Sequence, residues 1–478
     1  MPSTNQSPRM LPLLLLLPLV SAEFLTVVTD GDSSSLPLLC EEQTVISCSL
    51  VTLDLASLTE ATIQLMGEEL AFLDQPGQDT FTFVSEEGAE ATFTVDKELG
   101  VVWGHAELAD GRDFILEPAS DSCEGCHVLI EEDLALFPLD HAAPPPPGLL
   151  ERQSTAWGEK AVSLLAKGVK DKKTVVTYTI KVYYTPEVNK ANKDVATMVS
   201  NIIATTNQGY INSKIPIRVK LHCLELTAKS EAQGMNSINT FSEHKGSMAK
   251  LRNSADAAAL LIQKNNQWCG VGYVQPGDQK VKVQNLPFTT ASVTVVSCGL
   301  GTYTFGHEVS HNMGNTHDKY ADTQSSSTPN KPAYAKGYHL PGTNYRTIMA
   351  YPYNGGFTQA INYYSNPSLK FKNIATGDEK EADAARMITE IRFALAGLGD
   401  ESTKCKTAVK PTKTTVKPTK TTTAKTTIAS TTTAKATTTV RATTTVKATT
   451  AKPTTTTTDN DYYGGGDYYG GGDSDYYG

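Results

Sequence analysis

The N-terminal third of the chain alternates apolar and polar residues between short turn signals. Residues 79–84 (Asp-Thr-Phe-Thr-Phe-Val) and 91–95 (Ala-Thr-Phe-Thr-Val) show the pattern most clearly. Because successive side chains of a strand point to opposite faces, a period of two indicates β-strands. The pattern therefore predicts a β-rich region over residues 23–140. The proline run at 144–147 ends this region, and a linker is expected to follow it as far as residue 173.

From residue 174 onward the apolar positions indicate helices as well as strands. Val195, Met198 and Ile202 recur at the spacing of one helix face. Strands that alternate with helices predict a mixed sheet with helices packed on it. The expected strands cover residues 175–184, 215–224, 257–262, 271–274 and 292–296, and the expected helices lie at 195–203, 241–253 and 384–395.

Both ends of the chain differ in composition from the region between them. Residues 11–20 form an apolar run that is too short to span a bilayer, and a Val-Ser-Ala triplet after it fits a cleavage site. We therefore expect a signal peptide over residues 1–22 and a secreted, extracellular product without a membrane span; an uncleaved anchor is the alternative. Residues 403–458 are rich in Thr, Lys and Pro and predict a low-complexity stalk, and residues 459–478 repeat Asp-Tyr-Tyr-Gly as a flexible tail.

Charge divides the chain into an acidic first part and a mildly basic second part. The formal net charge is -9, and the acidic residues are concentrated before residue 174. The two parts are either unrelated surfaces or complementary faces that dock, because opposite potentials steer association. Lys170, Lys172 and Lys173 lie at the boundary and mark either a processing site or a solvated linker. The bases of the stalk are too dispersed to form a nucleic-acid groove, so no nucleic-acid partner is expected.

One short run, His-Glu-x-x-His-x-x-Gly-x-x-His, carries the candidate chemistry. His307 and His311 are four residues apart, so a helix places both imidazoles on one face. Glu308 follows the first histidine and can reach a water on a shared metal ion. Gly314 allows the helix to end in a left-handed turn, after which His317 supplies a third ligand. Three protein ligands leave a fourth position open for water, as a catalytic zinc site requires.

This run resembles the zinc motif of the metzincin metalloproteases. In that clan a methionine turn passes beneath the metal, and Met349 in Thr-Ile-Met-Ala-Tyr lies at a suitable distance downstream. Asp318, directly after the third histidine, makes the chain similar to the reprolysin (adamalysin) branch. The resemblance implies an α/β (α+β) catalytic domain over about residues 175–400, with a twisted mixed sheet and a zinc-binding active-site helix. Other stretches similar to this branch are residues 254–256, 269–274 and 363–367, and residues 110–118 resemble reprolysin propeptides.

The resemblance also implies a reaction and a cofactor. One zinc ion would lower the pKa of its water to about 7, and Glu308 would take the water proton as general base. Tyr351 stands where reprolysins usually carry proline and astacins and serralysins carry tyrosine, so it either hydrogen-bonds the oxyanion or only packs. Protein or peptide substrates would add a strand to a sheet edge, for which residues 270–273 are the candidate. The sequence does not decide whether structural calcium is bound.

The chain contains eight cysteines, which an exported protein can pair. Cys269 and Cys298 flank two expected strands before the metal motif, and we expect them to form a disulfide. Cys123 and Cys126 lie late in the first domain and allow two interpretations. They form a local disulfide, or one of them blocks the zinc as a thiolate in a cysteine switch. Further candidate pairs are Cys223 with Cys405 and Cys40 with Cys48.

These observations predict a secreted zinc metalloendopeptidase that is made as a zymogen. The alternative is a matrix or surface protein built on an inactive metzincin fold, but such a protein would have no reason to keep Glu308. Association with extracellular matrix or a surface through the stalk is compatible with either. The expected parts are a signal peptide (1–22), a propeptide (23–173), a catalytic domain (174–402), the stalk (403–458) and the tail (459–478).

Overall fold

The computed structural model describes residues 22–28, 40, 43–77, 79–119, 125–143, 155–274, 283–322, 332–352 and 358–400. All of these residues belong to one compact unit. Residues 1–21 of the expected signal peptide, the stalk and the tail lie outside the described residues. Within the described part of the chain, no helix is long and apolar enough to cross a membrane.

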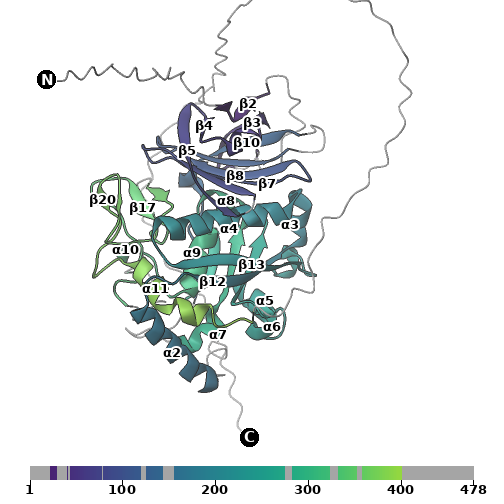
Figure 1. Cartoon of the computed structure of the whole chain (residues 1–478). Coiled ribbons are helices and arrows are strands. Elements are labelled where there is room, and N and C mark those ends of the chain that lie inside the picture. Colours follow the sequence, from purple (N-terminus) through teal and green to yellow (C-terminus); the bar gives the residue numbers. More distant parts are fainter. Residues whose placement is uncertain are drawn as a thin grey trace, which may run out of the picture. The chain divides into compact units, whose positions relative to one another are not determined.

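The β-rich region predicted from the alternation is confirmed as a ten-stranded sheet, which we call the N-terminal sheet (Figure 1). Its strands are β1 (Ala22–Glu23), β2 (Leu25–Val27), β3 (Val45–Leu53), β4 (Thr62–Leu65), β5 (Glu68–Gly77), β6 (Thr80–Val84), β7 (Glu90–Asp96), β8 (Val101–Glu107), β9 (Asp113–Pro118) and β10 (His127–Glu132). Their order is β1-β4-β5-β6-β7-β8-β9-β10-β3-β2. The β1–β4 pair is parallel, and the other pairs are antiparallel.

The two sets of alternating side chains in β6 and β7 are both buried, for different reasons. Phe83 and Phe93 lie on the face that encloses the core of this sheet. The threonines face the other way, toward helix α4 (Val195–Asn212), and pair across the strands. The Asn201 amide of α4 donates to the Thr92 and Trp103 carbonyls, both at 3.1 Å. The polar half of the pattern therefore forms an interface with the next layer, where buried polar groups need partners.

A six-stranded sheet, which we call the central sheet, forms the next layer. It contains β11 (His141–Ala143), β12 (Val176–Tyr184), β13 (Ile217–Leu226), β14 (Ala257–Ile262), β15 (Gly270–Tyr273) and β16 (Ala291–Val295). The order is β11-β15-β16-β14-β12-β13, and only the β15–β16 pair is antiparallel. Figure 1 shows α4 between the N-terminal sheet and the central sheet. The five strands expected after residue 174 are all found, with bounds shifted by at most about two residues.

Most of the remaining elements are short. The helices are α2 (Thr155–Lys170), α3 (Pro186–Ala191), α5 (Ile238–Glu243), α6 (Met248–Arg252), α7 (Leu286–Thr289), α8 (Val296–Gly301), α9 (Thr304–Asn312), α10 (Lys319–Asp322) and α11 (Ala384–Leu395), and the short strands are β17 (Tyr345–Thr347), β18 (Gln359–Ile361), β19 (Lys370–Phe371) and β20 (Ile374–Ala375).

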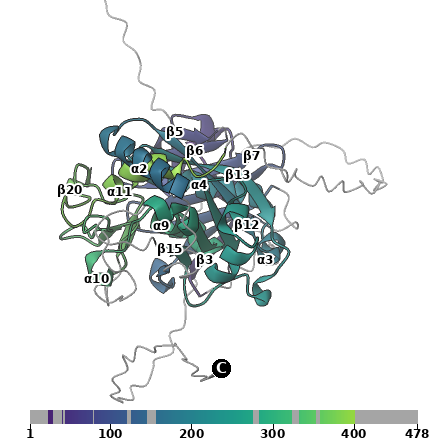
Figure 2. The same cartoon turned by 90° about the horizontal axis from the view of Figure 1, so that it is seen from below.

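Two expectations about helices were wrong. The single helix expected at 241–253 is divided into α5 and α6, because Gly246 between them takes a positive φ of 76° that ends the helical path. The expected linker contains α2, which packs against α11 (Figure 2). Their approach is close at Gly168, where a Cβ would lie 2.0 Å from the Glu390 carbonyl oxygen. Tertiary contact therefore stabilises a helix that composition alone did not indicate.

Arg392 on α11 fastens the segment that follows α2. Its side chain is fully buried and donates to the main-chain oxygens of Thr174 at 3.0 Å, Thr389 at 2.5 Å and Asp171 at 2.6 Å. The Arg392 Nη2 also forms an ion pair with the Asp171 carboxylate, at 3.3 Å. The guanidinium is buried and its hydrogen bonds are partly buried, so removing the side chain leaves several acceptors without their donor.

We expect Arg392→Met to lower the free energy of unfolding by about 2–4 kcal/mol, because several buried charge-assisted hydrogen bonds are lost together. The measurement is urea-induced unfolding followed by circular dichroism. Arg386→Met is the matched control: Arg386 lies on the same helix but is 47% exposed and pairs with Glu390, so its loss should cost about 1 kcal/mol or less. Equal effects of the two substitutions would contradict this role of Arg392.

Candidate metal centre

Helix α9 and the turn after it bring the three predicted histidines together. His307 and His311 lie one turn apart on α9, with ring centroids 4.7 Å apart. The helix ends before Gly314, whose φ of 89° suits glycine and whose Cβ position would lie 2.2 Å from a Met387 side-chain carbon. The chain then turns back, so that the His317 Nε2 lies 3.1 Å from the His311 Nε2. The sequence prediction for Gly314 is confirmed in its backbone geometry.

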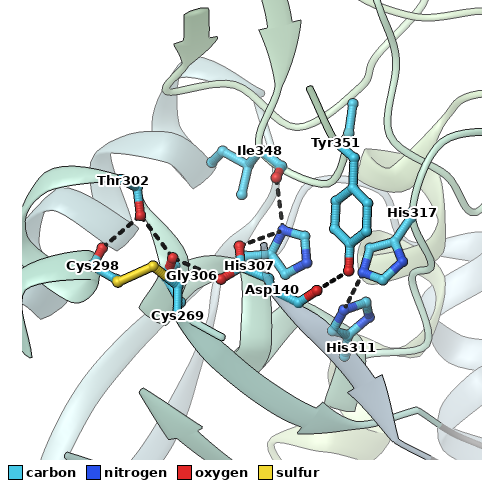
Figure 3. Close-up of polar contacts among 12 residues, drawn as sticks. Asp140, Cys269, Cys298, Thr302, Gly306, His307, His311, His317, Ile348 and Tyr351 are labelled. Atoms are coloured by element: carbon cyan, nitrogen blue, oxygen red, sulfur yellow. Dashed lines mark hydrogen bonds and ion pairs between the residues drawn. A yellow bond between two sulfur atoms is a disulfide. The ribbon is translucent and has the colours of Figure 1, made fainter. Parts of the chain in front are cut away.

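The hydrogen bonds of two histidines fix which ring nitrogen is available. The Nδ1 of His307 contacts the Ile348 carbonyl at 2.8 Å, and the Nδ1 of His311 contacts the Asn315 carbonyl at 2.9 Å (Figure 3). A carbonyl can only accept, so each Nδ1 must carry the proton and each Nε2 keeps a lone pair. This arrangement is typical of histidines that bind a metal through Nε2.

The donor set fits a zinc ion. Ligand atoms of His307, His311 and His317 lie within 4.8 Å of one another and are buried. Among the described residues, the His307 Nε2 has no hydrogen-bond partner, which is costly for a buried polar atom unless a metal uses it. Burial lowers the pKa of His307 to about 4 and that of His317 well below its usual value, so both rings are neutral ligands near neutral pH. Three neutral imidazoles are a ligand set of catalytic zinc.

Glu308 lies beside this set with its carboxylate unpaired within the described structure. Both carboxylate oxygens are buried and lack a partner there. Burial, and next the nearby Asp140 carboxyl, raise the pKa of Glu308 well above its usual value. The helix carrying Glu308 lies so close to β15 that Cβ atoms at Gly270 or Gly272 would come within about 2.6 Å of it. The Gly-Val-Gly spacing of β15 therefore leaves room for Glu308, and it is a sequence feature that can mark this part of the site.

The loop carrying Met349 is held against the three histidines. Met349 is fully buried and follows Ile348, whose carbonyl accepts from His307. Asp318 fastens the same loop, because its carboxylate accepts the Tyr351 amide at 2.9 Å and the Tyr320 amide at 2.9 Å. Burial alone would raise the pKa of Asp318, but hydrogen bonds from His339 and from these amides hold it below its usual value. Asp318 is thus an ionised anchor of this loop.

The aromatic ring of Tyr351 lies beside two of the three histidines. Its centroid is 3.9 Å from that of His317, and its hydroxyl donates to the main-chain carbonyl of Asp140 (Figure 3). Tyr351 therefore faces the histidine cluster and makes a polar contact as well as a packing contact.

Asp140 is a residue of this site that the sequence did not reveal, because it belongs to no motif. It lies just before β11, with one carboxylate oxygen 3.0 Å from the Thr304 hydroxyl and the other 3.7 Å from the His307 Nδ1. Burial raises the pKa of Asp140 to about 7, and the Thr304 hydrogen bond and the positive charge of Arg346 oppose the rise. Asp140 also lies with His307 and Glu308 as a second group with potential ligand atoms.

The cysteines agree in part with their predicted pairing. The predicted disulfides Cys269–Cys298 and Cys40–Cys48 are both present. Cys126 is disulfide-bonded, so it carries no thiolate and cannot act as a cysteine switch in this structure, whereas Cys123 lies outside the described residues. Cys223 is disulfide-bonded, and Cys405 lies outside the described residues.

Comparison with known proteins connects this geometry with a family. Residues 174–365 match Reprolysin_5, described as Metallo-peptidase family M12. The metzincin resemblance is confirmed. Three curated relatives are each named "Peptidyl-Asp metalloendopeptidase". The relative from Stenotrophomonas maltophilia is 27% identical over 298 residues, covering 60% of this chain and 66% of its own length. The Xanthomonas campestris relative is 26% identical, covering 60% and 65%, and that from Pseudomonas fragi is 38% identical, covering 16% and 51%.

The chain thus spans slightly less than two thirds of the relatives that match it over the longest stretch. Among solved structures it is similar to metalloproteinase-II from Bacteroides fragilis, with a TM-score of 0.29 and 8% identity over 54% of this chain and 80% of the other. A likeness of that degree carries no argument here. The resemblance to this family accordingly rests on the matched region and on the histidine cluster.

A buried carboxyl group of the N-terminal sheet is hydrogen-bonded to residues next to the histidine-bearing helix α9 and on β18. Glu107 on β8 accepts from the Tyr303 hydroxyl at 2.6 Å and from the Gln359 side-chain amide. Tyr303 directly precedes α9, and Gln359 lies on β18. Burial raises the pKa of Glu107 to about 8, with the Tyr303 hydrogen bond opposing the rise. Near neutral pH this contact therefore holds a largely protonated, neutral carboxyl group.

A carboxyl group whose pKa is raised on folding stabilises the folded state fully below its unfolded pKa, and this contribution is lost as the pH rises through its folded pKa. For Glu107 this stabilisation is lost between about pH 4.5 and about pH 8. We expect the free energy of unfolding to fall by about 2 kcal/mol between about pH 6 and about pH 9 because of Glu107. In Glu107→Gln this part of the pH dependence should be missing. Urea-induced unfolding at several pH values measures the free energy of unfolding of both proteins. The exposed Glu98→Gln is the control, and an unchanged slope in Glu107→Gln would contradict the assignment.

Proposed function

We propose that residues 174–402 form a zinc-dependent endopeptidase that hydrolyses peptide bonds in proteins, and that the chain is secreted as a zymogen. The observation that carries the proposal is the convergence of His307, His311 and His317 beside the unpaired carboxylate of Glu308. The family match, the relatives' names and the predicted signal peptide support it.

In this proposal the three histidines hold the metal through Nε2, and Ile348 and Asn315 orient two of the rings. Bound zinc would supply an acidified water and a polarised substrate carbonyl. Glu308 accepts a proton from the water and delivers it to the leaving amine nitrogen. Both carboxylate oxygens of Glu308 lack a partner among the described residues, so either can take that proton.

Tyr351 and strand β15 would act on the substrate itself. The Tyr351 hydroxyl already donates to a peptide carbonyl, that of Asp140, at the edge of the histidine cluster. A substrate carbonyl in the same place would receive the same hydrogen bond as negative charge develops on it. β15 would bind the peptide main chain by strand addition, since β11 pairs with it in this structure.

Latency would come from the same strand pairing. β11 lies on the β15 edge and Asp140 lies beside the histidines, so residues 134–143 cover the place that a substrate needs. The disulfide at Cys126 disfavours the cysteine-switch explanation for that residue. Cleavage near Lys172 and Lys173, which are exposed, would detach the preceding part of the chain from the catalytic domain.

The names of the relatives extend the proposal to the substrate. Proteins named for peptidyl aspartate are 26–28% identical to this chain over the longest matches. We infer that the peptides cleaved by this chain contain aspartate next to the scissile bond.

The direct test separates metal binding from catalysis. Glu308→Gln should keep one zinc ion and lose roughly 10²- to 10⁴-fold in peptide hydrolysis, because the ligands remain while the proton acceptor is removed. His317→Ala should lose both zinc and activity, because two imidazoles hold the ion poorly. Zinc content by atomic absorption and hydrolysis of a fluorogenic peptide measure the two effects. Glu379→Gln, at an exposed carboxylate, is the control; hydrolysis at the wild-type rate by Glu308→Gln would refute the mechanism.

A further inference from the structure

The segment before β11 passes through the site as a peptide would. The Leu139 carbonyl accepts the Cys269 amide at 3.3 Å, and the Ala143 carbonyl accepts the Val274 amide at 2.9 Å. Between these two points β11 pairs with β15. Asp140 is therefore held by main-chain hydrogen bonds on both sides, at the level of the histidine cluster.

Asp140 makes two kinds of contact at this position. Its main-chain carbonyl accepts from Tyr351, a contact that any residue could make. Its side chain enters a specific environment: the carboxylate accepts from Thr304, the first residue of α9, and is only 16% exposed. The amino end of a helix favours negative charge, which adds to the Thr304 hydrogen bond. Figure 3 shows Asp140 between His307 and Tyr351.

Arg346 supplies the positive charge on the same cavity. Asp140, Tyr303, Tyr351 and Arg346 all line a cavity of about 30 Å³, enough for about one water. Arg346 uses Nε and Nη1 on the carbonyls of Thr358 at 3.2 Å and Ala350 at 2.6 Å, which fixes the guanidinium. Among the residues that the structure describes, no carboxylate forms an ion pair with it.

The carboxyl groups that act on Arg346 from a distance come mainly from the N-terminal part of the chain. They are, in order of effect, Asp140, Asp318 and Glu107, and they oppose a lowering of the Arg346 pKa by burial. If the part of the chain before residue 174 is removed, Asp140 and Glu107 leave with it. The fixed guanidinium would then face an open cleft with only Asp318, which is already bound to the loop amides. Such a site attracts a new carboxylate.

We propose that Asp140 occupies the subsite with which the mature enzyme selects an acidic side chain, and that Thr304 and Arg346 form this subsite. The proposal rests on the endopeptidase function proposed above and assigns residues to its substrate preference. In the precursor Asp140 fills this subsite. After processing has removed Asp140, an aspartate of the substrate fills it.

Two peptides that differ only in Asp or Asn at the selected position test the preference. The protease recovered from expression of the full chain should cleave the Asp peptide with a kcat/KM roughly 10- to 100-fold higher, as expected for a hydrogen-bonded charge. In Arg346→Met that ratio should fall toward one while cleavage of the Asn peptide persists, and Arg346→Lys should restore part of it. Thr304→Val should lower the ratio in the same direction.

Lys319→Met is the matched control, because Lys319 is another cation near the histidines, next to Asp318, but is exposed. Its ratio should equal that of the wild type. A ratio near one in the wild type, a ratio that survives in Arg346→Met, or one lost in Lys319→Met would overturn the proposal while leaving the endopeptidase function intact.

A second measurement uses the uncleaved chain and does not depend on activity. Hydrogen exchange of the Val274 and Cys269 amides reports the pairing of β11 with β15. Asp140→Asn should accelerate this exchange roughly tenfold or more. In an Arg346→Met background the same substitution should have little further effect, because each substitution alone already removes the interaction between the two side chains. Independent, additive effects would refute an electrostatic coupling between the two residues across the cavity. If no peptide is cleaved by any variant but the two substitutions are coupled, the endopeptidase function fails and the coupling of Asp140 with Arg346 stands.

Discussion

The convergence of three imidazoles and one carboxylate in a space shielded from water is the constraint on which the structure depends. Buried polar atoms without partners are costly, and here the His307 Nε2 and both oxygens of Glu308 are in that state within the described chain. The fold holds them in place with main-chain groups and Asp318, each of which has its own fixed partners. A site that is held so firmly, while its central polar atoms have no partner in the described chain, is organised to bind a metal ion.

Close packing against β15 explains how this cluster is placed at the edge of a sheet. Gly270 and Gly272 remove the side chains that would collide with Glu308, so α9 can lie directly on the strand that would bind a peptide. Glu308, the proposed general base, is thus next to the main-chain hydrogen bonds that would position the substrate. Gly314 has a similar function at the other end of α9, where both its positive φ and the contact with Met387 exclude a Cβ.

The N-terminal sheet contributes polar contacts as well as a hydrophobic core. Residues outside the N-terminal sheet are hydrogen-bonded to Thr92, Trp103 and Glu107. In addition, β11 extends the central sheet by one strand. The N-terminal sheet therefore meets the rest of the described chain at a hydrogen-bonded interface. Several of its acids are buried rather than spread over a surface, and burial raises the pKa values of Glu107 and Glu117 to about 8. Such an interface favours a neutral form of these groups.

The sequence by itself determined most of the strands and the candidate metal ligands, because both depend on local spacing. A period of two produced the strands of the N-terminal sheet, the apolar runs produced β12 to β16, and the spacing of His307, His311 and His317 produced the cluster. Long-range packing decided the rest. Helix α2 is stable because it packs on α11, the helix expected at 241–253 is broken at Gly246, and Asp140 and Arg346 come from segments about 200 residues apart. No local pattern can place such residues in one cavity, since only the folded chain brings them together.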